Sequence, residues 1–205
     1  MTRGKFITLE GIDGVGKSTQ AALLAEFLIN HKKIHAITTR EPGGTPFGEQ
    51  LRKMMFDGGW DGVGEVLLMA AARREHVRHR ISPALNDGTW VVCDRFTDST
   101  IAYQGGGRGV CKEWIADVMR EVEKDARPDL TFYFRAPDDF SPPTGDDAFE
   151  QSGSEFYRAV DDAYRRLAEE NPARIITIDG VKDGTRRSVE DIAAEMQKTV
   201  ETRWP

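Results

Sequence analysis

The chain has 205 residues, of which 39% are hydrophobic and 30% charged, and its formal net charge is −6. This length suits one domain with a full core, and no apolar run is long enough to span a membrane. The acidic balance argues against nucleic acid as the main partner, because polyanion binding needs a basic face. The two cysteines have no metal-ligand spacing, and the first residues carry no signal-peptide or targeting pattern. We therefore expect a single domain over residues 1–205 in a reducing, cytoplasmic setting, without a disulfide.

Residues 6–19 are typical of a buried strand, a glycine-rich turn and the start of a helix. Within them, Gly11, Gly16, Lys17 and Ser18 fit the pattern G-x-x-x-x-G-K-[ST] of a phosphate-binding loop, or P-loop. Glycines let successive backbone N–H groups point inward around an anion, and the helix turns its positive dipole end to the same place. In such a loop Lys17 reaches the β- and γ-phosphates and the Ser18 hydroxyl binds Mg²⁺. An ordinary glycine turn is the alternative, which the apolar strand and amphipathic helix on either side make the weaker interpretation. The residues expected to hold the nucleotide are Gly11, Asp13, Gly14, Val15, Gly16, Lys17, Ser18 and Thr19.

Strand patterns alternate with helical patterns along the rest of the chain. Short apolar strands are predicted over residues 6–9, 34–39, 89–93, 130–134 and 174–178. Helices are predicted near residues 17–31, 47–56, 62–86, 98–104, 112–125, 154–170 and 187–202. The alternation indicates an α/β fold of the P-loop NTPase type, with a parallel five-stranded sheet flanked by helices. Ligands of such sheets lie at the carboxyl ends of the strands.

The loop after the second predicted strand, residues 40–46, contains two prolines and two glycines. Arg40 at the strand end is placed to pair with a phosphate or to hydrogen-bond a base, with Glu41 as its counter-ion. A surface turn that carries a solvated ion pair accounts for the same two residues equally well.

The predicted helix over residues 62–86 contains four arginines, which makes part of it the most basic stretch of an acidic protein. Arg73 follows the apolar run directly and is the arginine best placed to reach a cleft, whereas a solvated helix face is the alternative. His76 and His79 are expected on the surface.

Asp94 ends the third predicted strand and is followed by Arg95. An acidic residue at the end of an apolar strand, downstream of a phosphate-binding loop, is a usual way to hold Mg²⁺. Arg95 is placed to bridge two phosphates. The alternative is an ion pair that caps the strand, and the phosphate-binding loop upstream favours the metal site.

Two later loops also have the composition of binding loops. Residues 99–109 are rich in glycine and contain Tyr103, whose ring either offers a flat face to a sugar or base or packs in the core. Residues 135–153 are rich in Asp, Pro, Ser and Gly, with no Lys or Arg after Arg135. This composition predicts a short flap, or LID, near residues 135–154.

Taken together, these motifs resemble the thymidylate kinases, P-loop nucleoside-monophosphate kinases that convert dTMP to dTDP with ATP. The resemblance covers nearly the whole chain and rests above all on the loops at residues 40–45, Arg-Glu-Pro-Gly-Gly-Thr, and 103–109, Tyr-Gln-Gly-Gly-Gly-Arg-Gly. The second loop has the form found in the bacterial branch. Further matching stretches are residues 6–19, 65–73, 83–85, 88–90, 94–96 and 102–104.

The resemblance implies roles for individual positions. Lys17, Arg95 and Asp13 would be the catalytic residues, with Asp13 contacting the deoxyribose and the acceptor phosphate. Ser18 and Asp94 would hold Mg²⁺, and ATP would be the phosphoryl donor. At the substrate, Arg73 would contact the acceptor phosphate, Thr100 and Gln104 would line the base side, and Tyr103 would pack under the sugar. The full substrate set implied is Asp13, Arg40, Met69, Arg73, Arg95, Ser99, Thr100, Tyr103 and Gln104.

The resemblance also implies partners. ATP and dTMP are the expected small-molecule partners, with neither nucleic acid nor a membrane among them. A homodimer is expected, and the helix that carries Leu67, Leu68 and Ala71 is the candidate interface.

Two positions depart from the family pattern. Where the family stacks an aromatic residue on thymine, four positions before the helix arginine, this chain has Met69, a softer and more adaptable side chain. The family also supplies a catalytic arginine from the P-loop or the flap, whereas here the loop has Gly14-Val15 and the flap has none. Three alternatives could supply the missing charge, and the sequence does not choose among them. The charge comes from Lys17, Arg95 and Mg²⁺ alone, from one of the arginines Arg108, Arg135 and Arg158 after it moves into the site, or from a partner subunit.

Three functions follow from this pattern. The leading hypothesis is a dTMP kinase of dTTP biosynthesis. The second keeps the chemistry but accepts a modified pyrimidine or a purine deoxynucleotide, because of Met69. The third, a nucleotide-binding protein without transfer activity, is motivated by the missing arginines, although Lys17, Ser18, Asp94 and Arg95 are all retained.

Overall fold

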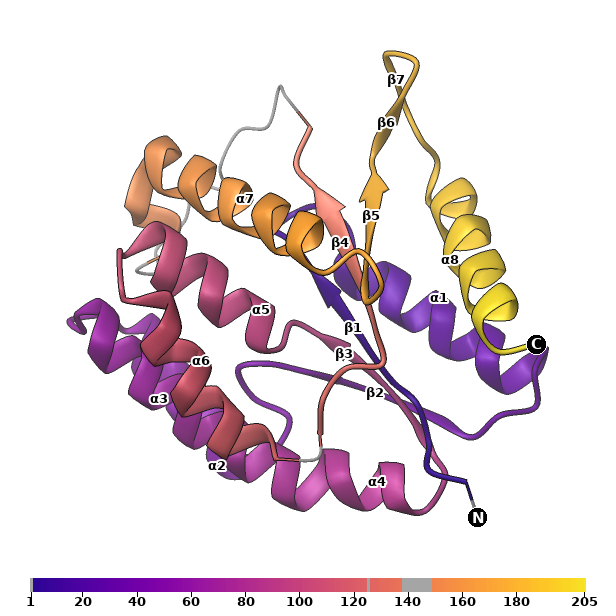
Figure 1. Cartoon of the computed structure of the whole chain (residues 1–205), viewed down its shortest axis with the longest axis horizontal. Helices are drawn as coiled ribbons and strands as arrows, with labels where there is room; N and C mark the ends of the chain where they lie inside the picture. The colour runs from indigo at the N-terminus through magenta and orange to yellow at the C-terminus, as the bar shows by residue number, and fades with distance from the viewer. Residues whose placement is uncertain (1, 125, 138–148) are drawn as a thin grey trace.

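The computed structural model describes residues 2–124, 126–137 and 149–205. Five parallel strands form one sheet in the order β2-β3-β1-β4-β5 (Figure 1). They are β1 (Phe6–Glu10), β2 (Ala36–Arg40), β3 (Trp90–Asp94), β4 (Leu130–Arg135) and β5 (Ile175–Asp179). A hairpin of β6 (Val181–Lys182) and β7 (Thr185–Arg186) projects beyond the end of β5. The predicted α/β class and five-stranded parallel sheet are confirmed.

Helices cover both faces of the sheet (Figure 1). Helices α1 (Lys17–Asn30) and α8 (Val189–Arg203) lie side by side on one face, where Ile7 and Val92 join their apolar cluster. Phe6 and Val91, the neighbours of those two residues along β1 and β3, belong to a cluster on the opposite face. This alternation follows from the two-residue period of a strand. The helices of the second face are α2 (Pro46–Phe56), α3 (Gly62–His76), α4 (Ser82–Asn86), α5 (Thr97–Thr100), α6 (Lys112–Glu123) and α7 (Gly153–Glu170).

The register of the strands brings three of their carboxyl ends together. Asp94 of β3 lies beside Leu9 of β1 on one side and beside Arg40 of β2 on the other. The loops that follow these strands therefore begin at one edge of the sheet, which is where an α/β sheet binds its ligands.

The predicted elements are present, with boundaries that differ by one or a few residues. The predicted 62–86 helix is continuous but changes to π-helical geometry at Val77–Ile81, between α3 and α4. The short helix predicted at 98–104 is α5 followed by a π-helical segment, Ile101–Gly107. The last helix begins at Val189 rather than 187, because the Ser188 side chain caps it by accepting the Asp191 N–H at 3.0 Å.

Glycines at the end of the second π-helical segment allow it to pack closely on α7. A Cβ on Gly107 would lie 2.3 Å from the Phe156 ring, and a Cβ on Gly106 would lie 2.6 Å from the Ala163 Cβ. Most of the predicted flap, residues 138–148, lies outside the described residues, so its form stays a prediction. Among the helices of the described part, none is long and apolar enough to cross a membrane.

Candidate active site

The glycine-rich loop, residues 11–18, connects β1 to α1. Gly11, Gly14 and Gly16 all have positive φ angles, of 137°, 82° and 94°, and a Cβ on Gly11 would lie 2.5 Å from the Phe134 carbonyl oxygen. These positions therefore require glycine. Lys17, the first residue of α1, is 5% exposed, and its Nζ donates to the Ile12 carbonyl at 2.5 Å. Burial, followed by the nearby charge of Arg95, lowers the pKa of Lys17 to about 7.

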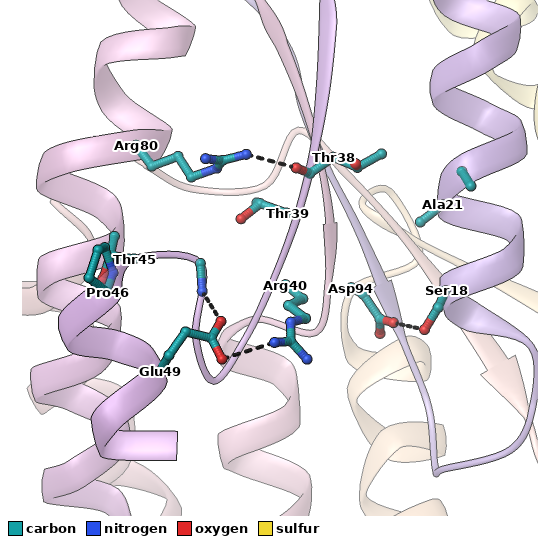
Figure 2. A pocket seen from close by; sticks show the side chains of 12 residues that line it. Ser18, Ala21, Thr38, Thr39, Arg40, Thr45, Pro46, Glu49, Arg80 and Asp94 are labelled. Atoms are coloured by element: carbon teal, nitrogen blue, oxygen red, sulfur yellow. Dashed lines mark hydrogen bonds and ion pairs between the residues drawn. The ribbon is translucent and has the colours of Figure 1, made fainter. Parts of the chain in front are cut away.

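Ser18 and Asp94 meet at the start of α1 and the end of β3 (Figure 2). The Ser18 hydroxyl donates to Asp94 Oδ2. Asp94 Oδ1 is buried and has no hydrogen-bond partner among the described residues. A hydroxyl beside an unsatisfied carboxylate oxygen offers the hard oxygen donors that Mg²⁺ prefers. Because the part of the chain that is described contains no cluster of three His, Cys, Asp or Glu ligands, an ion here would take its other ligands from phosphate and water.

Arg95 forms the centre of the site. Its Nη2 donates to Asp13 Oδ1 at 2.7 Å and to the Tyr103 hydroxyl at 2.9 Å, and its Nη1 donates to Ser99 at 3.1 Å and Tyr164 at 3.2 Å. Its backbone is in the left-handed region, with φ of 68°, which a non-glycine residue adopts at some cost. Although burial alone would raise the pKa of Asp13, the charges of Arg95 and Lys17 lower it to about 2. Asp13 is therefore an anion at neutral pH.

Glu10, the last residue of β1, accepts hydrogen bonds from two residues that surround Arg95. Its Oε1 accepts the Phe96 N–H at 2.7 Å, directly after the strained Arg95, and its Oε2 accepts the Ser99 hydroxyl at 2.6 Å. The side chain is fully buried. Burial, reinforced by the charge of Asp98, raises the pKa of Glu10 to about 7. The sequence analysis missed this residue, because a single carboxylate at the end of an apolar strand gives no sign of what lies across from it.

A cavity of about 270 Å³ lies on the Arg95 side of the site. The predicted substrate residues that line it are Asp13, Met69, Arg95, Ser99, Tyr103 and Gln104. Other walls come from Glu41, Pro42, Arg52, Met55, Phe56 and Phe149. We call this space the acceptor cavity.

A second cavity, of about 650 Å³, lies on the other side of the glycine-rich loop, and we call it the donor cavity. Predicted nucleotide residues lining it are Asp13, Gly14, Val15, Gly16 and Thr19. Arg135 also lines this cavity and pairs with Asp179 at 2.6 Å. Asp13 lines both cavities, so the donor and acceptor sides meet at the Asp13–Arg95 pair.

Known proteins resemble this chain over nearly its whole length. The profile of the thymidylate kinase family matches residues 9–192. The chain is 44% identical to a thymidylate kinase of Nitrosomonas europaea over 97% of its own length and 98% of the relative's. It is likewise 44% identical to one of Chromobacterium violaceum, over 95% and 92%. A crystal structure of thymidylate kinase from Ehrlichia chaffeensis superimposes with a TM-score of 0.79 at 37% identity, covering 97% of this chain and 99% of that one.

The chain belongs to the thymidylate kinase family. It is accordingly an enzyme of the nucleoside-monophosphate kinase class, and the predicted resemblance is confirmed. Not every residue that the resemblance implied is found in the acceptor cavity, however.

Arg73 does not line the acceptor cavity, and its expected contact with the acceptor phosphate stays a prediction. Its side chain is fully buried, and Nε donates to Glu41 Oε2 at 2.7 Å. Nη1 donates to the Thr100 hydroxyl at 3.1 Å and to Met119 Sδ at 2.9 Å. Thr100 is also fully buried and lies behind the cavity wall. In this thymidylate kinase family member, Arg73 and Thr100 therefore support the wall through Glu41, whose own carboxylate neutralises the arginine.

His76 was expected on the surface, and this expectation is wrong. The ring is fully buried, with Nδ1 2.9 Å from Glu41 Oε1 and Nε2 2.7 Å from the Thr39 hydroxyl. The helix places His76 on the same face as Arg73, about one turn later, and both side chains bond to Glu41 just after the end of β2. His79 is exposed, as expected.

Arg40 lies outside the acceptor cavity as well. It pairs with Glu49 at 2.9 Å and lines a separate space beside Ser18 and Asp94 (Figure 2). The expected counter-ion is wrong, because Glu41 pairs with Arg73 and His76 instead. The expected contact of Arg40 with a phosphate or base stays a prediction.

Arg52 is the charged residue of the acceptor cavity that the sequence analysis missed. It donates to the Pro42 carbonyl at 2.9 Å and lies over the Phe56 ring, 4.4 Å from its centroid. The sequence signal for Arg52 was an arginine on the helix that follows the Arg-Glu-Pro-Gly-Gly-Thr loop. Sequence alone did not show which face of this helix borders the cavity, so the signal was not sufficient.

Proposed function

We propose that this member of the thymidylate kinase family transfers the γ-phosphoryl group of ATP to dTMP, giving dTDP and ADP. The observation that carries the proposal is the position of Asp13 and Arg95 between the donor and acceptor cavities. A cation held between two phosphates lowers the cost of bringing them together and stabilises the charge that develops on the transferred group.

ATP would lie in the donor cavity with its phosphates on Gly14, Val15 and Gly16, next to Lys17 at the start of α1. Ser18 and Asp94 would hold Mg²⁺, which neutralises charge on the β- and γ-phosphates when it is bound. Support for this assignment comes from the unsatisfied Oδ1 of Asp94. Because the pKa of Lys17 is about 7 in the free protein, the polyphosphate would draw a proton onto its amine on binding.

The acceptor needs no strong general base, because a phosphate oxygen of dTMP is already anionic. The low pKa of Asp13, about 2, supports an orienting role, through Arg95 and the Tyr103 hydroxyl, which donates to Asp13 at 3.0 Å. Catalysis then consists of positioning and charge stabilisation. We propose Arg52 as a further contact of the acceptor phosphate, and Tyr103 and Gln104 as contacts of the sugar and base.

The charge that the family takes from a flap or P-loop arginine would come here from Lys17, Arg95 and Mg²⁺. Residues 136–157 contain no Lys or Arg. Of the three arginines considered above, Arg135 is the one that lines the donor cavity. Arg108 pairs with Glu65 at 3.2 Å and lies over Phe156, which holds it away from both cavities. Arg135 is therefore the best placed to add a further charge.

A second candidate function is a deoxynucleoside-monophosphate kinase with broader base specificity. Met69 lines the acceptor cavity next to Met55, and both are unbranched and adaptable. The test is an enzyme-linked ADP-release assay with ATP and Mg²⁺ on dTMP, dUMP, the thymine ribonucleotide, dGMP, dAMP and dCMP. Activity confined to dTMP supports the first function, and comparable activity on a purine supports the second. Met69→Phe should narrow the profile towards dTMP in either case, and an unaltered profile would mean that Met69 does not contact the base.

We propose that the chain forms a homodimer through α2 and α3. Exposed apolar side chains gather on these two helices, which pack against each other: Phe47, Met54, Val63 and Leu67. Such a patch on a monomer marks an interaction surface. Sedimentation as a dimer at micromolar concentration would support this arrangement, whereas a Leu67→Lys variant should sediment as a monomer.

A further inference from the structure

A third cavity lies on the flank of the sheet, beside Ser18 and Asp94 (Figure 2). Its volume is about 600 Å³, within the usual range of small-molecule sites. The walls come from the start of α1, the end of β2, the start of α2 and the π-helical segment Val77–Ile81. None of its lining residues lines the donor or the acceptor cavity. We call it the flank cavity.

Two arginines supply the flank cavity with positive charge. Arg80 reaches from the helix towards β2, and Arg40 stands at the end of that strand (Figure 2). Arg80 Nη2 donates to the Thr38 carbonyl at 3.3 Å, and Arg80 has no ion pair within the described parts of the chain. A guanidinium group has five N–H donors, so most of the donors of Arg80 are left for a ligand.

Glu49 and Asp94 are the two carboxylates that line the flank cavity, and of their four oxygens Asp94 Oδ1 alone lacks a hydrogen-bond partner among the described residues. Glu49 uses Oε2 to pair with Arg40 at 2.9 Å and Oε1 to accept the Gly44 N–H at 3.0 Å. Asp94 accepts from Ser18 and faces the proposed metal position. Apart from Asp94 Oδ1, which we assign to the metal, the unused hydrogen-bonding capacity of the charged side chains in the cavity consists of guanidinium N–H donors.

We propose that the flank cavity binds a small oligophosphate anion through Arg80 and Arg40, either free pyrophosphate or the polyphosphate end of a nucleotide. The planar fork of a guanidinium matches phosphate oxygens in a bidentate way, and two such groups suit adjacent phosphates. A concave site in a protein of net charge −6 favours a small anion over a nucleic-acid polyanion, whose binding needs an extended basic face. The flank cavity shares Ser18 and Asp94 with the proposed metal position, so the anion would lie at its Arg80 and Arg40 side, beside the bound Mg²⁺ and nucleotide.

The test is an amide NMR titration of the full-length protein with pyrophosphate. ADP, dTMP and excess Mg²⁺ are present at saturating concentration, so that the donor and acceptor cavities are filled. The amides of Thr38 and Thr39 report on the flank cavity, and those of Gly14 and Gly16 report any displacement of ADP. The variant Arg80→Ala removes one proposed ligand, and Arg78→Ala is the matched control. Arg78 lies in the same π-helical segment and is exposed, but it does not line the cavity.

We expect saturable shifts at Thr38 and Thr39, with a dissociation constant at least about tenfold larger in Arg80→Ala and unchanged in Arg78→Ala, since one charge-assisted contact is worth about a factor of ten or more. A second titration with CTP distinguishes the two sources of the anion. Tighter binding than pyrophosphate would assign the site to nucleotides, and equal binding would assign it to the phosphate groups alone. Shifts confined to Gly14 and Gly16, or equal weakening in both arginine variants, would overturn the proposal.

Discussion

Replacing Lys17 by methionine should stabilise the free protein while it removes turnover. The amine is 5% exposed and its pKa is lowered from 10.5 to about 7 by burial and by Arg95. The unfolded chain therefore binds more protons than the folded one between pH 7 and 10.5, and stability rises with pH across that window. Burying the amine therefore lowers the free energy of unfolding by about 5 kcal/mol below pH 7, and by about 3 kcal/mol at pH 8. A neutral side chain of similar volume escapes this penalty.

Thermal unfolding at pH 8 should accordingly show a higher Tm for Lys17→Met, at about 2–4 °C for each kcal/mol in a chain of this size. The rate of ADP release should fall by about three orders of magnitude, because the lysine would act on the transferred phosphate. Lys198→Met, an exposed lysine on α8, is the control and should change neither quantity.

Calorimetry of ATP binding tests the same reasoning without relying on stability. In buffers of different ionisation enthalpy at pH 8, wild-type protein should take up about 0.9 proton per ATP, because an amine with a pKa of about 7 is then mostly neutral before binding. Lys17→Met should take up close to none. Wild-type binding without proton uptake, or the same uptake in the variant, would refute this account of Lys17.

Three further predictions concern the support of the site. Asp94→Asn should raise the Mg²⁺ concentration needed for half-maximal activity by about tenfold or more, because a carboxylate ligand is lost. The Tm should change little, because the hydrogen bond to Ser18 can remain. An unchanged Mg²⁺ requirement would mean that Asp94 does not belong to the metal site. His76→Ala should lower the free energy of unfolding by about 2–4 kcal/mol in urea titrations, since it leaves Glu41 without one of its buried partners. The control His79→Ala, at an exposed position, should change the free energy of unfolding by no more than about 0.5 kcal/mol. Equal effects of the two substitutions would contradict the buried network. Glu10→Gln should flatten the pH dependence of stability between pH 4.5 and 7. Because the pKa of Glu10 is raised to about 7, the folded wild-type protein binds one more proton than the unfolded chain in that window, and its stability falls by up to about 3 kcal/mol as the pH rises. Identical stability profiles of wild type and variant would mean that Glu10 does not titrate there.

The sheet, the glycine-rich loop and most residues around it were predictable because their causes are local. The apolar run of residues 6–9 and the glycine spacing after it specify a strand and a loop whatever the rest of the chain does. Asp94 and Arg95 were found because they end a strand, and strand ends of a parallel sheet meet at one edge.

The burial of His76 and Arg73 could not be predicted in this way, because it depends on a residue far away in the sequence. Both side chains lie on one face of a basic helix, and in isolation that face is as well solvated as any other. Glu41, at the end of β2, turns it into a buried ion-pair network. The same reason hid Glu10, whose role depends on Phe96 and Ser99 across the site.

The most direct test of the central claim is chromatographic measurement of dTDP and ADP formed by the purified protein from ATP, Mg²⁺ and saturating dTMP. The account predicts one dTDP for each ADP, with no ADP formed when dTMP is left out, because the Asp13–Arg95 pair joins the donor and acceptor cavities. ADP released without dTDP, or ATP bound with neither product formed, would contradict it.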